Sequence, residues 1–300
     1  MRTVALTRTL AAVSVGTGLA AGLAGCATSV GAGDGPTDTA WIVYGARAFL
    51  IQAEGGEPEL CLGGVAESYP PQCGGPVVVG LDWDDVPDAE TASGVTWGSG
   101  WVVGTFDGET FTLTEPVRQE PPEGYEAPEP GGDRDFQPLC DDPWRGGDEE
   151  ATAADPMGAV GRLQERAAAL PGYVELYVSD GASEFNVLLT PDADAEAAHA
   201  SLREVWPGWL CVGTIEDTGS SSRVPTNAEA MAASEALASA VGDDWAELGL
   251  LSWGPDTIGG TFDVQVVLET PDLRDRIELA LAPWYSADRV RITSALVPLP

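Results

Sequence analysis

The sequence predicts an α+β protein with a small β-barrel followed by a duplicated α-β-β-α-β domain of ferredoxin-like order. Three observations predict this class. Runs rich in aromatic and β-branched residues, separated by glycine-rich turns, fill the first folded part of the 300-residue chain. Proline and acidic residues interrupt every regular pattern over residues 118–137. Helical and strand patterns then alternate in an order that occurs twice.

The barrel is predicted over residues 40–117. A tight hairpin is expected at Asp107-Gly108, because an Asp-Gly pair there separates two strand-like runs. Four or five strands in roughly 80 residues indicate a closed or half-closed barrel of the oligonucleotide/oligosaccharide-binding kind. The strand candidates lie at residues 41–52, 77–83, 94–106 and 109–117.

The duplicated domain is predicted over residues 138–300, with copies at about 154–216 and 226–300. Helices are expected to start at Asp155-Pro156, at Thr190-Pro191-Asp192, at the capping box Thr226-Asn227-Ala228-Glu229 and at Thr270-Pro271-Asp272. If the strand at 209–215 is taken as the first element of the later copy, that copy has the complete order β-α-β-β-α-β. Residues 136–140 would supply the opening strand of the earlier copy. The remaining strand candidates are 173–178, 185–189, 248–253, 261–268 and 289–297.

The first 25 residues have the pattern of a secretory signal. Arg2 and Arg8 form a short basic start, and small residues at the end of an apolar stretch precede a cleavage point. Polar residues and glycines interrupt that stretch, which is shorter than the ~20 apolar residues of a membrane span. The ending Leu23-Ala24-Gly25-Cys26 resembles the lipobox of bacterial lipoproteins.

The lipobox resemblance implies that Cys26 is the first mature residue and carries a diacylglycerol, with fatty-acid chains such as palmitate, on its sulfur. The protein would then be lipid-anchored at the extracytoplasmic face of the cell membrane. Residues 26–39 are small and polar, which is typical of a flexible tether. The alternatives are an ordinary signal peptide with a chance cysteine, or a single membrane-spanning helix.

The charge of the chain is strongly negative. All 14 basic residues are arginine, against 48 acidic residues. Residues 1–25 contain two of the arginines and no acid, so the net charge of −34 becomes −36 after cleavage. Such a surface repels phosphate backbones, so we expect no nucleic-acid partner. A cation, a basic protein or a neutral ligand is compatible with this charge, although solubility is the simpler explanation.

Four cysteines remain besides Cys26, and an even number in an exported chain indicates two disulfides. Three pairings are open. Spacing favours Cys61 with Cys73, which brackets a short loop, and leaves Cys140 to pair with Cys211. A zinc site is disfavoured, because no Cys-x-x-Cys pair is present.

Residues 59–76 (ELCLGGVAESYPPQCGGP) resemble a stretch of uncharacterised exported proteins of high-GC Gram-positive bacteria. That resemblance implies an exported location and a Cys61–Cys73 bond, and it implies no activity.

The sequence excludes several catalytic classes. Without lysine there is no phosphate-binding Gly-Lys-Ser loop, no Schiff base and no Ser-x-x-Lys nucleophile. The single histidine, His199, is expected on a helix as a surface or packing residue. Gly98-Ser99-Gly100 does not match a nucleophile elbow. We therefore assign no catalytic residue, although paired carboxylates remain open.

Two candidate binding sites are indicated. The acidic cluster Asp82, Asp84, Asp85, Asp88 and Glu90 offers oxygen ligands for calcium, although its spacing does not match a calcium loop. The simpler interpretation is a solvated acidic turn.

Trp97 and Trp101 lie an even number of residues apart and so share one face of a strand. Facing outward, they would stack on sugars. Facing inward, they would fill the barrel core, which is the favoured interpretation.

The function favoured by the sequence is a non-catalytic lipoprotein of the cell envelope that presents an extracytoplasmic binding surface, with a protein as the expected partner. One alternative is a carboxylate-dependent hydrolase acting on wall glycans, which needs two carboxylates ~5–10 Å apart. Another is a protein that binds calcium or a small ligand. No cofactor other than calcium is indicated.

Overall fold

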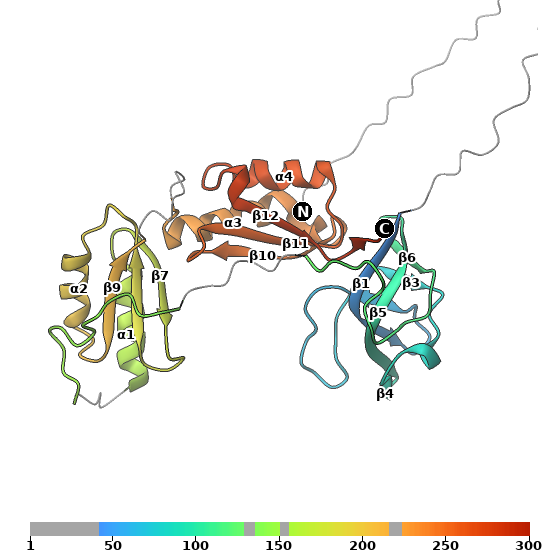
Figure 1. Cartoon of the computed structure of the whole chain (residues 1–300), viewed down its shortest axis with the longest axis horizontal. Helices are drawn as coiled ribbons and strands as arrows, with labels where there is room; N and C mark the ends of the chain where they lie inside the picture. Colours follow the sequence, from blue (N-terminus) through green and yellow to red (C-terminus); the bar gives the residue numbers. More distant parts are fainter. Residues whose placement is uncertain (1–41, 129–135, 151–155, 216–223) are drawn as a thin grey trace, which may run out of the picture. The chain divides into compact units, whose positions relative to one another are not determined.

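A computed structural model describes residues 42–128, 136–150, 156–215 and 224–300. Its first part is the closed β-barrel that the sequence predicts (Figure 1). The sheet runs in the order β13-β1-β2-β3-β6-β5-β4, and a further pairing of β1 with β5 closes a ring of five strands. The strands are β1 Val43–Ala53, β2 Glu59–Cys61, β3 Val77–Val79, β4 Glu90–Ala92, β5 Val95–Phe106, β6 Thr110–Leu113 and β13 Val297–Pro298.

Small residues allow the barrel to close tightly. Ala48 on β1 lies opposite Gly100 on β5. A Cβ atom on Gly100 would lie 2.3 Å from Cγ1 of Val117, and one on Gly104 would lie 2.2 Å from the carbonyl oxygen of Thr112. Both distances are far shorter than a carbon contact, so glycine is required where these backbones approach. The buried core consists of Tyr44, Ala46, Ala48, Leu50, Leu60, Val78, Val86, Val102, Phe111, Val117, Val267 and Leu296.

The predicted hairpin between β5 and β6 is formed. Oδ1 of Asp107 accepts hydrogen bonds from the backbone N–H groups of Thr110 (2.8 Å) and Glu109 (3.0 Å). These bonds favour the ionised carboxylate and hold the pKa of Asp107 below its ordinary value. Gly108 has a φ of 108°, a conformation that favours glycine.

The predicted strand at 77–83 is shorter than expected. β3 ends at Val79, and the short 3-10 helix η1 (Trp83–Asp85) follows. Gly80 has a φ of 87°, which turns the chain out of the sheet. The Asp82 carboxylate then accepts a hydrogen bond from the N–H of Asp84 (3.0 Å) and caps η1.

Parts of the chain outside residues 40–117 also pack on the barrel. Arg118 and Trp101 exchange two backbone hydrogen bonds, of 2.8 and 3.1 Å. The ring of Tyr125 lies 4.6 Å from that of Trp101. At the other end of the chain, β13 pairs with β1 through Val297 and Pro298. The sequence predicted none of these contacts, because each joins residues far apart in the chain.

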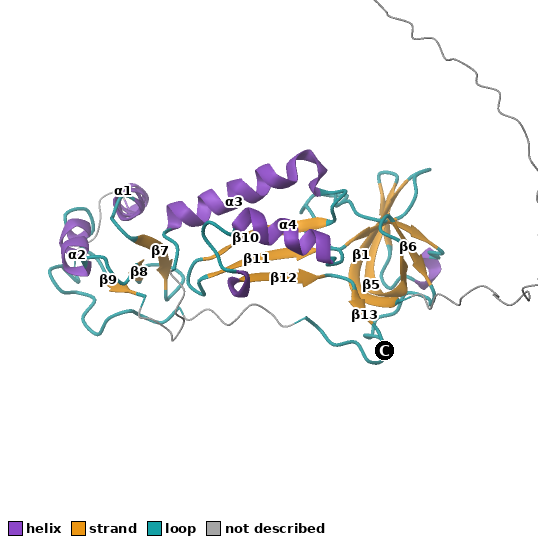
Figure 2. Cartoon of the chain, turned by 90° about the horizontal axis from the view of Figure 1, so that it is seen from above, coloured by secondary structure: helices purple, strands orange, loops and turns teal. Residues whose placement is uncertain are grey.

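The second part contains two three-stranded sheets, β7-β8-β9 and β10-β11-β12, each with two helices. In both units the elements follow the order α-β-β-α-β, with an antiparallel pair and then a last strand parallel to the middle one. Figure 2 shows α3 and α4 together on one face of their sheet. The first unit comprises α1 Pro156–Ala168, β7 Tyr173–Val178, β8 Phe185–Leu189, α2 Ala195–Arg203 and β9 Leu210–Thr214. The second comprises α3 Asn227–Val241, η2 Gly242–Trp245, β10 Leu250–Asp256, β11 Thr261–Val266, α4 Pro271–Leu281, η3 Ala287–Arg289 and β12 Val290–Ser294.

The two sheets differ from the expected arrangement in one respect. β9 pairs in parallel with β8, with Asn186 opposite Cys211, and so belongs to the first unit. It does not open the second, and residues 136–140 form no strand. Each unit therefore has three strands in the described chain. The reason is that the chain leaves β8 through α2 and returns as β9, and a strand connected in this way ordinarily pairs in parallel with the strand before the helix.

Three of the predicted helix starts are confirmed and one is wrong. Thr226 and Glu229 form the reciprocal capping box of α3, and Thr270 caps α4. α1 starts at Pro156 as predicted, whereas its expected capping residue, Asp155, lies outside the described residues. α2 starts later than predicted, because Asp194 rather than Thr190 caps it.

Both faces of β8 are covered, because residues 137–140 lie against the face opposite the helices. All five side chains of β8 are buried. Asn186, fully buried, accepts a hydrogen bond from the N–H of Leu139 (2.9 Å). Tyr177 donates one to the carbonyl of Gln137 (2.8 Å). The disulfide between Cys140 and Cys211 links this segment to β9.

Candidate functional site

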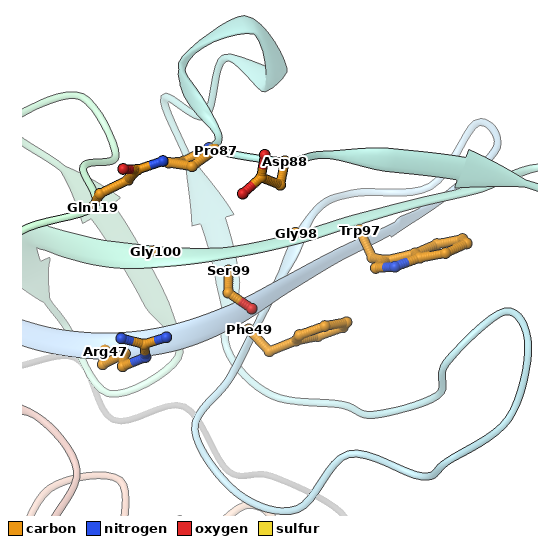
Figure 3. A pocket seen from close by; sticks show the side chains of 9 residues that line it. All are labelled: Arg47, Phe49, Pro87, Asp88, Trp97, Gly98, Ser99, Gly100 and Gln119. Atoms are coloured by element: carbon orange, nitrogen blue, oxygen red, sulfur yellow. The ribbon is translucent and has the colours of Figure 1, made fainter.

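A pocket of about 490 Å³ lies on the outer surface of the barrel, over β1 and β5 (Figure 3). This volume is in the range typical of small-molecule sites. The segment between η1 and β4 and the segment after β6 complete its walls. The lining residues are Arg47, Phe49, Pro87, Asp88, Trp97, Gly98, Ser99, Gly100 and Gln119.

The alternation of side chains along β5 explains which residues reach this pocket. Val102 belongs to the barrel core, so Trp97, Ser99 and Trp101 lie on the outer face of the same strand. The register places Ser99 directly opposite Phe49 on β1. Figure 3 shows these two side chains next to each other.

Trp97 and Trp101 therefore do not fill the barrel interior, which was the favoured expectation. On the inner face of β5, a Cβ atom on Gly98 or Gly100 would lie 2.5 or 2.3 Å from Cγ1 of Val86 or Val117, so these valines leave no room there for an indole. Trp97 is nevertheless only 8% exposed, and the ring of Tyr69 lies against it in an edge contact at 5.5 Å. Trp101 is half-buried against Tyr125. Both rings are covered by neighbouring segments on the outside of the barrel.

Arg47 gives the pocket a cation. Its side chain is exposed and has no hydrogen-bond or ion-pair partner among the described residues. Eight of the other nine described arginines bind a carboxylate, hydroxyl or carbonyl oxygen. Those eight are Arg118, Arg145, Arg166, Arg203, Arg274, Arg276, Arg289 and Arg291. The charge of Arg47 is thus available to a ligand.

Asp88 brings a carboxylate to the same pocket. Its backbone φ of 53° lies in the left-handed region, which residues other than glycine, asparagine and aspartate rarely adopt. Its side chain is exposed. The pocket therefore contains one anionic and one cationic group, with Ser99 and Gln119 as neutral hydrogen-bonding groups.

The acidic cluster does not gather into one set of ligands. Asp82 caps η1, whereas Asp88 lines the pocket. Asp84, Asp85 and Glu90 are exposed. Across the described parts of the chain, no three histidine, cysteine or acidic side chains lie close enough to hold a metal ion.

His199 is a buried residue of α2, with 8% of its surface exposed. Burial, and then the nearby Arg145 and Arg203, hold its pKa below the ordinary value, so the imidazole is neutral near pH 7. His199 does not line the barrel pocket. Its environment is that of a packing residue.

The structure contains the two disulfides, Cys61–Cys73 and Cys140–Cys211. The first closes the loop that carries Tyr69, whose ring covers Trp97. Cys26, the predicted lipidation site, lies outside the described residues.

Sequence reasoning missed most of the pocket. It named Asp88 and Trp97, but not Arg47, Phe49 or Gln119. A signal was present for Arg47, which is the only charged residue in the predicted strand 41–52. An isolated charge in an apolar strand marks the solvent-facing side. Gln119 reaches the pocket only because the chain after β6 returns to the barrel, which has no local signal.

Comparison of this chain with protein families, curated proteins and solved structures finds no match. No helix in the described parts of the chain is long and apolar enough to cross a membrane.

Proposed function

We propose that this chain is a non-catalytic, lipid-anchored protein of the cell envelope that binds its partner in the barrel pocket. The lipobox-like ending at Cys26 supports the anchor and the extracytoplasmic location. The tether at 26–39 would hold the barrel near the membrane surface.

One observation carries the binding role: Arg47, which has no partner in the part of the chain that the structure describes, lies in a pocket beside polar and aromatic side chains. A charged side chain at a protein surface is ordinarily solvated. In this pocket, however, a ligand that binds Arg47 can also contact the ring of Phe49, the hydroxyl of Ser99 and the amide of Gln119. Convergent polar groups in a recess of this size are typical of ligand sites.

The pocket favours binding over hydrolysis. Glycoside hydrolysis ordinarily needs two carboxylates on opposite sides of the scissile bond. Asp88 is the one carboxylate among the described residues that line the pocket. A wall-glycan hydrolase is therefore the weaker candidate.

The occupant expected from the sequence is a protein, whereas the dimensions of the pocket favour a small polar ligand. Tyr69 gives the protein alternative a specific observation: it is 76% exposed, at a loop closed by Cys61–Cys73. Exposed tyrosines are common binding anchors at protein interfaces. An envelope protein would use Tyr69 and the pocket together.

Tryptophan fluorescence tests the binding role directly. Fragments of the cell envelope are titrated into the parent protein and into Ser99→Trp, in which an indole on the outer face of β5 fills the pocket. Val79→Trp, on an exposed position of β3 outside the pocket, is the matched control. We expect binding by the parent and the control, and at least tenfold weaker binding by Ser99→Trp. Equal binding by all three proteins would exclude the pocket as the binding surface.

The anchor has its own test. Cys26→Ala removes the sulfur that would carry the lipid, so the variant should appear in the medium rather than in the membrane fraction. A variant that still fractionates with membranes contradicts lipidation at this position.

We also propose that the two α-β-β-α-β units are copies of one ancestral unit related to the ferredoxin-like order. Their shared α-β-β-α-β order supports this, as do the two Thr-Pro-Asp sequences, one directly after β8 and the other at the start of α4. An experimental structure in which the units superpose element by element would support the duplication. Units that differ in helix placement would contradict it.

A further inference from the structure

The charge of Arg47 contrasts with its surroundings. The chain has 48 acidic residues against 14 basic ones, yet this arginine has no acidic partner in the described chain. Arg162 on α1 is also exposed and has no partner among the residues that the structure describes, but it does not line the pocket. A guanidinium in a recess can donate two parallel hydrogen bonds to a carboxylate, a geometry that lysine cannot provide.

The groups around Arg47 are suited to hydroxyl groups. The Asp88 carboxylate accepts hydrogen bonds, the Ser99 hydroxyl both donates and accepts, and the Gln119 amide does the same with separate atoms. Asp88 would repel a second anionic group placed near it. A ligand that fits this arrangement has one carboxylate at the Arg47 end and neutral hydroxyls elsewhere.

The apolar part of the pocket is small and aromatic. Phe49 is half-buried on β1, and Trp97 and Pro87 contribute apolar atoms at the walls. Figure 3 places Phe49 between Arg47 and Trp97. A pyranose ring has an apolar C–H face and a hydroxyl rim, so it can contact an aromatic ring and polar groups simultaneously.

Two other ligand classes fit less well. A peptide bound by strand addition needs a free strand edge. β1 pairs with one edge of β5 along the whole strand. The other edge of β5 pairs with β4 at residues 95–97, with Arg118 at Trp101 and with β6 at residues 104–106, which leaves only a three-residue stretch beside the pocket, too short for an added strand. A phosphate ester carries a charge of about −1.5 to −2 near neutral pH. One arginine beside Asp88, in a chain of net charge −34, is a poor site for that charge.

Resting on the binding role proposed above, we propose that the barrel pocket recognises an acidic sugar. Arg47 binds its carboxylate, and Asp88, Ser99 and Gln119 bind its hydroxyls. Phe49 contacts the apolar face of the sugar ring.

Calorimetric titration with matched probes tests this assignment. The probes are a galacturonic acid disaccharide, the neutral galactose disaccharide and a tripeptide with a free C-terminal carboxylate. We expect the acidic disaccharide to bind the parent at least tenfold more tightly than the other two. Arg47→Gln should weaken that binding about 10- to 100-fold, because it removes charge-assisted hydrogen bonds. Arg47→Lys keeps the charge without the paired donors and should give an intermediate affinity.

Arg162→Gln is the matched control, because it removes an arginine outside the pocket that is also exposed and also has no partner among the described residues. It should bind the acidic disaccharide as the parent does. All variants should melt at the parent temperature, since Arg47 and Arg162 are exposed.

Three results would overturn the acidic-sugar assignment: no binding of the acidic disaccharide, equal binding of the neutral one, or tighter binding of the tripeptide. If envelope fragments still bind in a manner that Ser99→Trp abolishes, the binding role stands and only the ligand class is wrong. If envelope fragments do not bind either, both proposals fail.

Discussion

Removing each disulfide separately tests how the two cross-links stabilise the protein. The Cys61–Cys73 bond spans a sequence separation of 12 residues, and the Cys140–Cys211 bond spans 71. Because the entropy lost by the unfolded chain grows with the length of the closed loop, the two bonds should contribute ~2.8 and ~4.4 kcal/mol, respectively. The structure also predicts a larger loss of stability without the second bond, because this bond holds the segment around Cys140 against β9.

Urea unfolding followed by far-UV circular dichroism measures this difference. The double variants Cys61→Ala/Cys73→Ala and Cys140→Ala/Cys211→Ala are compared with the oxidised parent under identical conditions. We expect the second variant to be less stable than the first by ~1.5 kcal/mol. A first variant that is equally or more destabilised would show that loop length does not govern the contribution of these bonds.

Three further predictions concern other parts of the molecule. Gly104→Ala should destabilise the barrel by about 3 kcal/mol, because its Cβ atom would lie 2.2 Å from the carbonyl oxygen of Thr112. A Cβ atom on Gly254 would have no atom of another residue within 4 Å, so Gly254→Ala should leave the urea midpoint unchanged. The pKa of His199 is lowered in the folded state. Its contribution to stability is therefore complete above about pH 6.5, and it declines as the pH falls toward the lowered pKa, because the unfolded chain binds the proton first. The melting temperature of His199→Gln should therefore change less between pH 7 and pH 5 than that of the parent. Addition of a calcium chelator should leave the melting temperature unchanged, because Asp82 is occupied in capping η1. A decrease of several degrees would instead support calcium binding by the acidic cluster.

The local features of the fold were predictable because their causes lie within a few residues. The hairpin at Asp107-Gly108 depends on hydrogen bonds to one carboxylate and on one glycine conformation. The capping box at Thr226 depends on a residue three positions away. The late start of α2 is the exception, since Thr190 and Asp194 both offer a capping side chain and the helix uses the second.

The pocket was harder to predict because it assembles four separate segments. Arg47 and Phe49 come from β1, Asp88 from the chain after η1, residues 97–100 from β5, and Gln119 from beyond β6. Trp97 was recognised as part of a strand, but its face could not be assigned. Alternation along a strand separates two faces without saying which one meets the core, and the interior glycines of β5 decided that question.

By itself, the sequence determined the strongly acidic composition, four of the five strands of the barrel ring (β1, β3, β5 and β6, but not β2), the α-β-β-α-β order of the second part and the residues that cap α3 and α4. These depend on composition, on periodicity and on hydrogen bonds between near neighbours. Only the tertiary structure decided that β1 closes on β5, that β9 stays with β8, that β13 returns to the barrel and that Arg47 faces a pocket. Each of these results selects one partner among several distant segments of similar pattern, and that selection depends on packing between residues far apart in the chain.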